Sequence, residues 1–404
     1  ITSKASSLSM VSKRSKLQPA RGTQDILPLE CKLLRYVEET AFEVASRYGF
    51  GEISTPIFEN TEVFSQTLGN TSDIVTKEMY TFKDRGKDSV TLRPEGTAGV
   101  ARAIISNGLT QDLPIKLFYR GPMFRYERPQ KGRRRQFQQV GIETIGASES
   151  QADIETISLG HQFLCKLGLS SKTTLEINTL GDPGSRAAYR EKLVNYLSNY
   201  QASLSEDSLV RLTQNPLRIL DSKSQKDQEI LSEVPLLKNS LSDESKKFFD
   251  EILSGLDQLS IKYKINDRLV RGLDYYTHTA FEFTSTALGA QNTVLAGGRY
   301  DGLINQMGGP EIPGIGWAAG VERLILLLDH IPSLERPISV IPVTNNLTSK
   351  ALNLAYQLRQ NGFNIDFGYN GNLKKRMKRA NKLNSYAAIL IEEKELSLNN
   401  ILIR

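Results

Sequence analysis

The sequence predicts an α+β chain with three parts: an antiparallel sheet flanked by helices, a helical insertion, and a C-terminal α/β domain. Two β-rich segments, 117–126 and 136–145, are joined by a turn rich in Pro, Gly and Arg, which is typical of a long antiparallel hairpin. From about 185 to 260 the segments are polar and helical and lack glycine-rich turns. After residue 337, strand and helix patterns alternate, which indicates parallel pairing. The 404 residues, 39% of them hydrophobic, suffice for two to three domains with their own cores.

The first part begins with a helix. Apolar residues recur at helical spacing from Leu29 to Tyr48, and Gly49 occupies the position of a C-terminal capping glycine. Strand patterns follow at 52–55 and 89–92, and an Ala-rich helix begins near Thr97. The hairpin comes next.

The remaining elements follow the same two periodicities. In the insertion we expect helices at 185–197 and from about residue 242, and then strands at 261–265, 279–284 and 293–296 and a closing helix at 319–329. In the last domain we expect strands at 338–343, 363–367 and 387–391, with helices at 348–361 and 373–383. The last of these helices is strongly basic.

Composition excludes several classes of protein. Two cysteines, Cys31 and Cys165, are too few for a disulfide framework, and with three histidines they cannot build a Cys/His zinc site of the usual spacing. No apolar run approaches the ~18 residues that a membrane span needs. The balance of 39% hydrophobic and 24% charged residues is typical of a globular enzyme, and the cysteine usage favours a reducing, cytosol-like compartment.

The net charge of +6 is concentrated in two acid-free stretches. Residues 1–24 carry five basic residues and residues 374–382 carry six, so the rest of the chain is net acidic. Such local excess indicates either a polyanion partner or a targeting segment. Three interpretations of the Ser-rich segment 1–16 stay open: a remnant of an organellar transit peptide, a cloning remnant, or a solvated disordered tail.

The hairpin turn carries the strongest signal for chemistry. Residues 125–135 hold six basic residues against the single acid Glu127, and guanidinium groups bind phosphate oxygens in a bidentate way. A solvated basic turn is the alternative. On the strand that follows, Gln139, Gly141 and Glu143 share one face. This face suits a polar ligand, which the glycine would allow to approach closely. A half-exposed sheet face without a ligand is the other possibility.

Further candidate segments lie elsewhere in the chain. Residues 93–97 place charges and a hydroxyl at a strand-to-helix junction, where helix capping is an equally good explanation. Residues 270–278 combine arginine, acid and paired tyrosines, unless they form a surface turn. The glycine-rich runs 296–302 and 314–323 are weak phosphate-loop signals, because neither has the spacing of a known nucleotide-binding fingerprint.

Together these segments resemble one family, the class II histidyl-tRNA synthetases of bacterial or organellar type. The resemblance runs from about Leu17 to the C-terminus. It rests on the class II motifs at 49–59, 124–143 and 320–324, and on two segments specific to the histidine enzymes, 271–276 and 296–302. The resemblance implies a six-stranded antiparallel catalytic sheet, a helical insertion near the tRNA acceptor stem, an anticodon-binding domain and a homodimer built around the first motif.

The resemblance also implies roles for individual residues. In ATP binding, Arg125 would hold the α-phosphate, Glu127 and Arg133 would assist at adenine and the distal phosphates, and Arg323 would hold the γ-phosphate. In histidine binding, Glu95, Thr97 and Gln139 would hold the amino group, Glu143, Tyr275 and Tyr276 would surround the imidazole, and Arg271 would approach the carboxylate and α-phosphate. Arg125 and Arg271 are the expected catalytic residues. Mg²⁺ would accompany ATP without a protein metal site, since phosphate-bound Mg²⁺ needs no protein cage.

For the partners, the resemblance implies L-histidine, ATP and tRNA(His), in a cytoplasmic protein or, if the tail is a transit remnant, in a mitochondrial or plastid matrix. The basic helix would contact the tRNA backbone through Lys374, Lys375, Arg376, Lys378 and Arg379, although a solvated helix face is the alternative. The expected division is a tail at 1–16, a catalytic domain at 17–184 and 261–331, the insertion at 185–260, and the anticodon-binding domain at 337–404. Family members usually continue beyond the strand that ends at Ile391 with a further strand and helix, so this last domain looks short.

The resemblance implies a histidine–tRNA ligase, which activates L-histidine with ATP to histidyl-adenylate and transfers it to the 3′ end of tRNA(His). Two other functions are alternatives. A noncatalytic, histidine-sensing regulatory subunit would share the fold without charging tRNA. Such relatives lose the arginine segment or the anticodon domain, whereas this chain keeps Arg271 and most of that domain. A general RNA-binding protein would leave Arg271 and the polar strand face unexplained.

Overall fold

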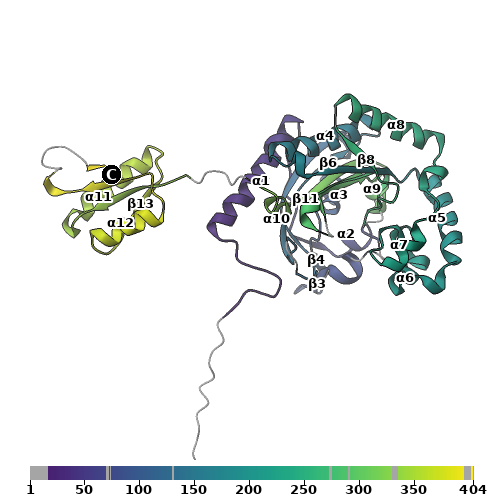
Figure 1. Ribbon diagram of the computed structural model, residues 1–404, viewed down its shortest axis with the longest axis horizontal. Coiled ribbons are helices and arrows are strands. Elements are labelled where there is room, and N and C mark those ends of the chain that lie inside the picture. Colours follow the sequence, from purple (N-terminus) through teal and green to yellow (C-terminus); the bar gives the residue numbers. More distant parts are fainter. Residues whose placement is uncertain are drawn as a thin grey trace, which may run out of the picture. The chain divides into compact units, whose positions relative to one another are not determined.

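The computed structural model describes residues 17–69, 72, 74–129, 132–272, 275–289, 292–329, 335–394 and 402–403. The predicted tail, residues 1–16, lies outside this range, as do Leu273 and Asp274 of one predicted site segment. The chain divides into two compact units, Ile1–His330 and Ile331–Arg404 (Figure 1). Among the described residues, no helix combines the length and the apolar character needed to cross a membrane.

Helix α1 (Pro28–Arg47) confirms the first predicted helix. Pro28 begins it, at a position where the missing N–H costs nothing. Leu34, Val37 and Ala41 are buried at helical spacing, so one face of the helix packs into the core. Gly49 follows the helix with φ +82°, a left-handed conformation that glycine adopts at no steric cost.

The main sheet holds the first unit together. Within the described residues it has eight strands in the order β1-β5-β6-β11-β10-β9-β7-β8. They are β1 (Gly51–Glu52), β5 (Ile115–Phe124), β6 (Gln136–Ile145), β7 (Thr174–Thr179), β8 (Tyr263–Ile265), β9 (Thr277–Thr284), β10 (Thr293–Arg299) and β11 (Gly314–Gly320). The six strands from β5 to β7 pair antiparallel throughout, as the resemblance implies, and β1 and β8 add parallel pairs at the two edges.

Strand β11 corrects one prediction. Residues 319–329 were expected to be helical, but Ala319 lies in β11, and helix α10 covers only Val321–Ile325. β11 pairs with both β6 and β10, so it is a central strand. Its glycines and alanines hide the usual strand pattern because they are small where neighbouring side chains approach closely. A Cβ atom at Gly316 would lie 1.9 Å from Oε2 of Glu143.

Helices cover one face of this sheet. These helices are α1, α4 (Ser150–Lys166), α8 (Asp243–Gln258) and α10. All four pack their buried side chains into one hydrophobic core (Figure 1). Trp317 of β11 is buried in it, stacks on Phe163 and donates from Nε1 to the carbonyl of Thr156 at 3.0 Å. Val140 and Ile142 of β6 point to the same core, so Gln139, Gly141 and Glu143 occupy the opposite face, as predicted.

The helical segment contains α5 (Pro183–Ser198), α6 (Glu206–Gln214) and α7 (Gln225–Leu231). Asp182 caps α5 by accepting from the amide of Ser185 at 2.7 Å, and it also accepts from the hydroxyls of Ser242 and Ser245 at the start of α8. Hydrogen bonds from Ser242 and Ser245 hold the pKa of Asp182 well below its usual range. Helix α8 was assigned to the insertion, yet its buried Ile252 and Leu256 pack into the core of the main sheet. The division at 185–260 stays a prediction.

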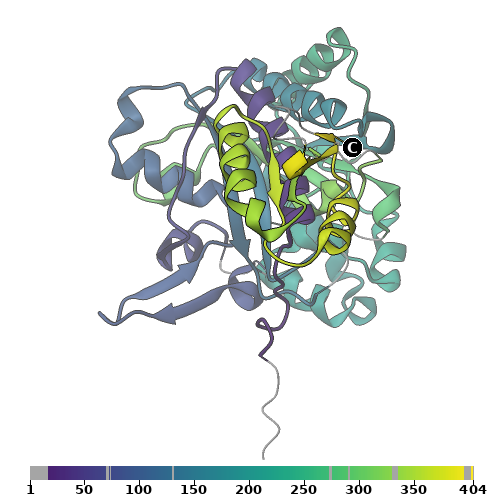
Figure 2. The same ribbon diagram turned by 90° about the vertical axis from the view of Figure 1, so that its left-hand side faces the viewer.

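A smaller sheet, in the order β2-β4-β3, lies beside the main one. Its strands are β2 (Phe58–Asn60), β3 (Tyr80–Lys83) and β4 (Ser89–Leu92), and the short helices nearby are α2 (Glu62–Ser65), α3 (Thr97–Ser106) and α9 (Leu303–Gln306). β3 and β4 form an antiparallel ribbon that projects from the body at the lower left of Figure 2. β4 has the predicted bounds and leads directly into the segment 93–97.

The second unit has its own sheet, in the order β13-β12-β14-β15. Its elements are β12 (Ile338–Pro342), α11 (Thr348–Gln360), β13 (Ile365–Phe367), α12 (Leu373–Lys382), β14 (Ala387–Ile391) and β15 (Leu402–Ile403). β12 pairs parallel with β13 and β14, which confirms the predicted α/β alternation. β15, which was not predicted, pairs antiparallel with β14.

Candidate functional site

The turn of the β5–β6 hairpin forms one wall of a polar pocket. The two strands pair without a bulge from Ile115 to Phe124, and the amide of Arg125 then donates to the carbonyl of Arg135 at 2.9 Å. Arg125 is held in place from behind, because its Nε donates to the carbonyl of Pro94 at 2.8 Å and its guanidinium lies over the ring of Phe137. Arg125 is therefore fixed by the fold at the start of the turn.

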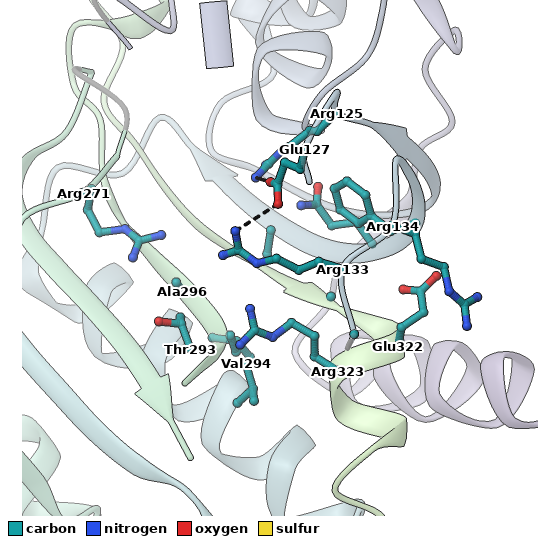
Figure 3. Close-up of a pocket in the computed structure, with 16 residues that line it drawn as sticks. Arg125, Glu127, Arg133, Arg134, Arg271, Thr293, Val294, Ala296, Glu322 and Arg323 are labelled. Atoms are coloured by element: carbon teal, nitrogen blue, oxygen red, sulfur yellow. Dashed lines mark hydrogen bonds and ion pairs between the residues drawn. The ribbon is translucent and has the colours of Figure 1, made fainter. Parts of the chain in front are cut away.

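Glu127 pairs with two of these arginines. Nη1 of Arg133 donates to its Oε2 at 2.9 Å, and Nη1 of Arg125 lies 3.8 Å from its Oε1. Figure 3 shows this carboxylate between the two guanidinium groups. The pairing partly neutralises the positive charge of the cluster and fixes the orientation of the two guanidinium groups.

Arginines distant in sequence complete the pocket. Arg323 enters from α10 and Arg271 from the segment before β9, and both point into the space that Arg133 faces (Figure 3). The cavity has a volume of about 260 Å³, and Gln139 contributes an amide to its lining. Burial and the neighbouring Arg133 lower the pKa of Arg323 to about 10. Such a concentration of guanidinium groups in a partly buried cavity favours an anionic ligand.

Buried polar atoms in the pocket also point to a ligand. Among the described residues, no hydrogen-bond partner reaches Nε of Arg271, Oε1 of Gln139 or Nη1 of Arg134, although all three atoms are buried. Buried donors and acceptors are rarely left unpaired, since each costs about 1–3 kcal/mol. A ligand with both anionic and donor groups would satisfy them.

A second cluster lies further along β6, around the buried carboxyl of Glu143. Its Oε1 accepts from the hydroxyl of Thr97 at 2.7 Å, and its Oε2 accepts from the phenol of Tyr300. Burial raises the pKa of Glu143 to about 8. A buried carboxyl with this pKa is protonated at neutral pH in the absence of a ligand, so it can exchange a proton with a basic group that binds there.

Glu95 lies beside this cluster but has a structural partner. Its two oxygens accept from the amides of Thr97 and Ala98, at 2.7 and 2.8 Å, so the carboxylate caps helix α3. Burial raises its pKa. Glu95 therefore caps α3, while Thr97 uses its hydroxyl to hold Glu143.

The structure corrects the prediction for Gly141. The glycine was expected to let a ligand approach the strand, but the ring of Tyr119 from β5 lies across it. A Cβ atom at Gly141 would come within 2.3 Å of Cζ of Tyr119, and one at Gly96 within 2.2 Å of the same ring. Both glycines therefore make room for the ring of this tyrosine.

The paired tyrosines after Arg271 belong to the same buried cluster. The rings of Tyr275 and Tyr276 lie 4.6 Å apart, and Tyr275 meets Tyr300 edge to face at 5.7 Å. The guanidinium of Arg271 lies 5.7 Å from the ring of Tyr276. These aromatic contacts connect the arginine pocket to Glu143.

The predicted site residues thus fall into two neighbouring groups. Arg125, Glu127, Arg133, Gln139, Arg271 and Arg323 line the pocket, whereas Glu95, Thr97, Glu143, Tyr275 and Tyr276 form the buried cluster. Tyr119 and Tyr300 are not among the residues that the sequence predicts for the site. Tyr300 lies in the flagged run 296–302, but only the hydrogen bond of its phenol shows that it faces Glu143. Arg299 of that run is no phosphate ligand here, because it is buried and paired with Asp153.

The basic helix α12 presents a different arrangement. Lys374, Lys375 and Lys378 are exposed, and Arg379 is exposed but paired with Asp366 at 2.7 Å. Arg376 corrects the predicted surface: it is 4% exposed, and it donates to the carbonyl of Pro342 and to Oδ1 of Asn345. Its guanidinium is directed into the unit, so Arg376 is removed from the predicted tRNA contacts.

Comparison with known proteins identifies the family. The family model described as histidyl-tRNA synthetase matches residues 22–324, and an anticodon-binding domain matches residues 338–404. The chain is 59% identical to a histidine–tRNA ligase of Rhodospirillum rubrum and 53% identical to one of Gluconobacter oxydans, in each case over 96% of this chain and 94% of the relative. The crystal structure of apo histidyl-tRNA synthetase from S. aureus superimposes with a TM-score of 0.80 at 36% identity, covering 96% of this chain and 94% of that one. The chain therefore belongs to the histidyl-tRNA synthetases.

Proposed function

We propose that the arginine pocket and the Glu143 cluster together form the site in which this chain activates histidine. The chain is an ATP-dependent ligase that joins histidine to tRNA(His). The observation that carries the site assignment is the convergence of Arg125, Arg271 and Arg323 on one cavity beside a buried carboxyl that binds hydroxyl donors. ATP would occupy the arginine pocket and the imidazole would lie towards Glu143.

The pocket accounts for the chemistry of the first step. When the histidine carboxylate attacks the α-phosphorus of ATP, the bond to the bridging oxygen breaks, pyrophosphate leaves, and negative charge grows on the phosphate oxygens. We assign Arg125 and Arg271 to this group, where fixed guanidinium groups stabilise the transition state more than the ground state. Arg323 and Arg133 would hold the distal phosphates, and Glu127 would assist at adenine while it orients Arg133.

The Glu143 cluster accounts for the choice of amino acid. Imidazole donates one hydrogen bond and accepts another, and the Glu143 carboxyl and the Tyr276 phenol can match both nitrogens. Thr97, Gln139 and Glu95 would surround the amino group, with Tyr275 packing against the ring. Amino acids without this pattern would leave buried polar groups unpaired, which costs far more than a missing apolar contact.

Mg²⁺ is proposed as a companion of ATP. It would neutralise charge on the phosphates and hold them in a reactive geometry. The described residues contain no group of three or more acids, histidines or cysteines arranged to hold a metal ion. The arginines would carry the remaining phosphate charge.

We further propose that the exposed lysines of α12 contact the tRNA backbone. Lys374, Lys375 and Lys378 lie on one exposed helix in the anticodon-binding unit, where cations contribute affinity without reading sequence. The compartment stays a prediction: cytoplasm, or an organellar matrix if residues 1–16 are a transit remnant.

A homodimer is also part of the proposal. The resemblance places the dimer interface at the motif around 49–59, and large apolar side chains gather near it in the described structure: Ile57, Phe58 and Phe82 are exposed by 44–57%. Exposed apolar patches of this kind commonly mark interfaces between chains. Equilibrium sedimentation tests this assignment directly.

The noncatalytic rival lacks support. The relatives at 53–59% identity that cover nearly the whole chain are named as ligases, and the described residues of the arginine pocket retain both Arg271 and Arg323. A regulatory subunit that only senses histidine has no use for a pocket that gathers arginines against three phosphates.

The test of this function is histidine-dependent exchange of labelled pyrophosphate into ATP, without tRNA. We expect exchange with histidine and none above background with phenylalanine or glutamine, because neither matches both imidazole nitrogens. Exchange without any dependence on histidine, or no exchange at all, would show that the assignment of this site is wrong.

A further inference from the structure

Glu282 of β9 is a carboxylate that neither the motifs nor the proposed ligand contacts explain. Its side chain is 15% exposed. Oε2 accepts from the hydroxyl of Thr293 at 2.8 Å and lies 3.3 Å from Nη1 of Arg271. Thr293 lines the arginine pocket beside Arg271 (Figure 3). Glu282 thus supports the pocket from the neighbouring strand.

Sheet stability does not account for this carboxylate. In the β7–β9 register, Glu282 lies directly opposite Glu176. Like charges at directly opposed positions destabilise an antiparallel pair. Glu176 has partners of its own: Nδ2 of Asn266 donates to its Oε2 at 2.6 Å, and Oγ1 of Thr284 lies 3.4 Å from its Oε1. The favourable contacts of Glu282 are those with Arg271 and Thr293, at the pocket.

Glu282 forms an ion pair with Arg271, as Glu127 does with Arg133. Each carboxylate contacts one nitrogen of a guanidinium that faces the cavity. Both carboxylates also oppose the lowering of the Arg323 pKa. Each of the two acids therefore orients the arginine with which it pairs.

Arg271 needs such support because little else among the described residues fixes it. Its Nε has no hydrogen-bond partner there, and its guanidinium otherwise lies near the ring of Tyr276. An arginine side chain carries about 2 kcal/mol of rotamer entropy, and the other guanidinium groups of the pocket repel it. Without an anchor, Arg271 would spend little time directed at the reacting phosphate.

We propose that Glu282 is a positioning residue for histidine activation: by holding Nη1 of Arg271, it directs the rest of that guanidinium, including the unpartnered Nε, at the substrates. This inference rests on the proposed role of Arg271. Glu282 itself touches neither substrate. Its contribution is to the geometry of the transition state, so its loss lowers kcat more than it raises KM.

The experiment is a double-mutant cycle on Glu282 and Arg271, read out as histidine-dependent ATP–pyrophosphate exchange. Glu282→Ala lowers kcat about 10–100-fold, with KM for ATP and histidine changed much less. In the Arg271→Ala background, the same substitution changes the residual rate by less than about twofold, because its only route to the reaction has been removed. Glu176→Gln, which alters the opposing carboxylate, is the matched control and leaves exchange unchanged.

Each outcome of this cycle is decisive. If the two single effects multiply in the double variant, or if Glu282→Ala exchanges at the wild-type rate, Glu282 does not act through Arg271. If Arg271→Ala itself exchanges at the wild-type rate, the proposed role of Arg271 fails first. Should Glu282→Ala fail to fold, Glu282→Gln keeps the shape of the side chain and must show the same non-additivity with Arg271→Ala.

Discussion

The arginine pocket and helix α12 are both basic, but their cations are used differently. In the pocket, Arg125, Arg133 and Arg271 are partly buried, and each is held by a carboxylate or a carbonyl. On α12 the lysines are exposed, whereas Arg376 and Arg379 are paired with other described residues of the unit. Fixed, desolvated cations act through geometry, whereas exposed cations act through a field that salt screens.

This difference leads to separate expectations for the two regions. Activity in the pocket should depend on the shape of each cation and on pH, and little on ionic strength. The contribution of α12 should depend on ionic strength and on the number of charges, and little on which basic residue supplies them. Substitutions that keep charge but change shape separate the two cases.

The largest effect is expected at Arg125. Replacing it with alanine removes a fixed donor from the α-phosphate, which typically costs 10²–10³-fold in kcat. Arg125→Lys keeps the charge but loses the planar fork and the contact with the Pro94 carbonyl, so it should recover little of the rate. Steady-state pyrophosphate exchange measures both variants. A lysine variant close to wild type would mean that the pocket, like α12, needs only charge.

The next effect concerns pH and stability at Glu143. Burial raises the pKa of this carboxyl from 4.5 to about 8. The folded protein then binds this proton more tightly than the unfolded chain does. The contribution of Glu143 to the free energy of unfolding is therefore fully present below about pH 4.5 and is lost as pH rises to about 8. Glu143→Gln cannot ionise, so its stability should fall less between pH 5.5 and 8.5, by on the order of a few kcal/mol. Urea unfolding at both pH values measures this.

The control for this prediction is Glu149→Gln, at an exposed position outside the cluster. It should leave the pH dependence of unfolding as in the wild type. If Glu143→Gln and wild type lose stability in parallel over this range, the carboxyl is ionised in the folded protein. Its proposed proton exchange with a bound imidazole would then be wrong.

The smallest effect is expected on α12. Replacing Lys374, Lys375 and Lys378 with alanine should leave pyrophosphate exchange unchanged and reduce tRNA affinity about tenfold at low salt. Each lost phosphate contact should also lower the slope of log affinity against log salt by about 0.7–0.9. Filter binding of tRNA across a salt series measures the slope. Lys350→Ala, an exposed lysine on α11 of the same unit, is the control and should change neither quantity.

Local patterns predicted most of the regular elements, because they depend on neighbours in sequence. The hairpin strands, β4, α12 and the face of β6 that carries Gln139 and Glu143 all follow from period and turn composition. β11 was not predicted because its glycines and alanines allow close packing instead of forming a strand pattern. Gly316, for example, leaves room for the carboxyl of Glu143. The sequence pattern there is one of small residues, which also suits loops and helices.

The candidate site was predicted less completely, for a related reason. Residues in contiguous motifs, such as Arg125 and Arg271, could be recognised by type and spacing. Tyr119, Tyr300 and Glu282 contact residues that are distant in the sequence, and only the folded sheet brings them together. Arg376 shows the opposite error: its position in a run of cations suggested a surface role, but its turn of the helix faces the sheet.

The most direct test of the account is to measure pyrophosphate exchange and tRNA charging side by side for Arg271→Ala and for the triple lysine variant of α12. We predict that Arg271→Ala reduces both activities to a small residual rate, because little adenylate is formed, and that the lysine variant is weakened in charging alone, with exchange at the wild-type rate. Full exchange by Arg271→Ala, or loss of exchange in the lysine variant, would contradict the division between a pocket that acts by geometry and a helix that acts by charge.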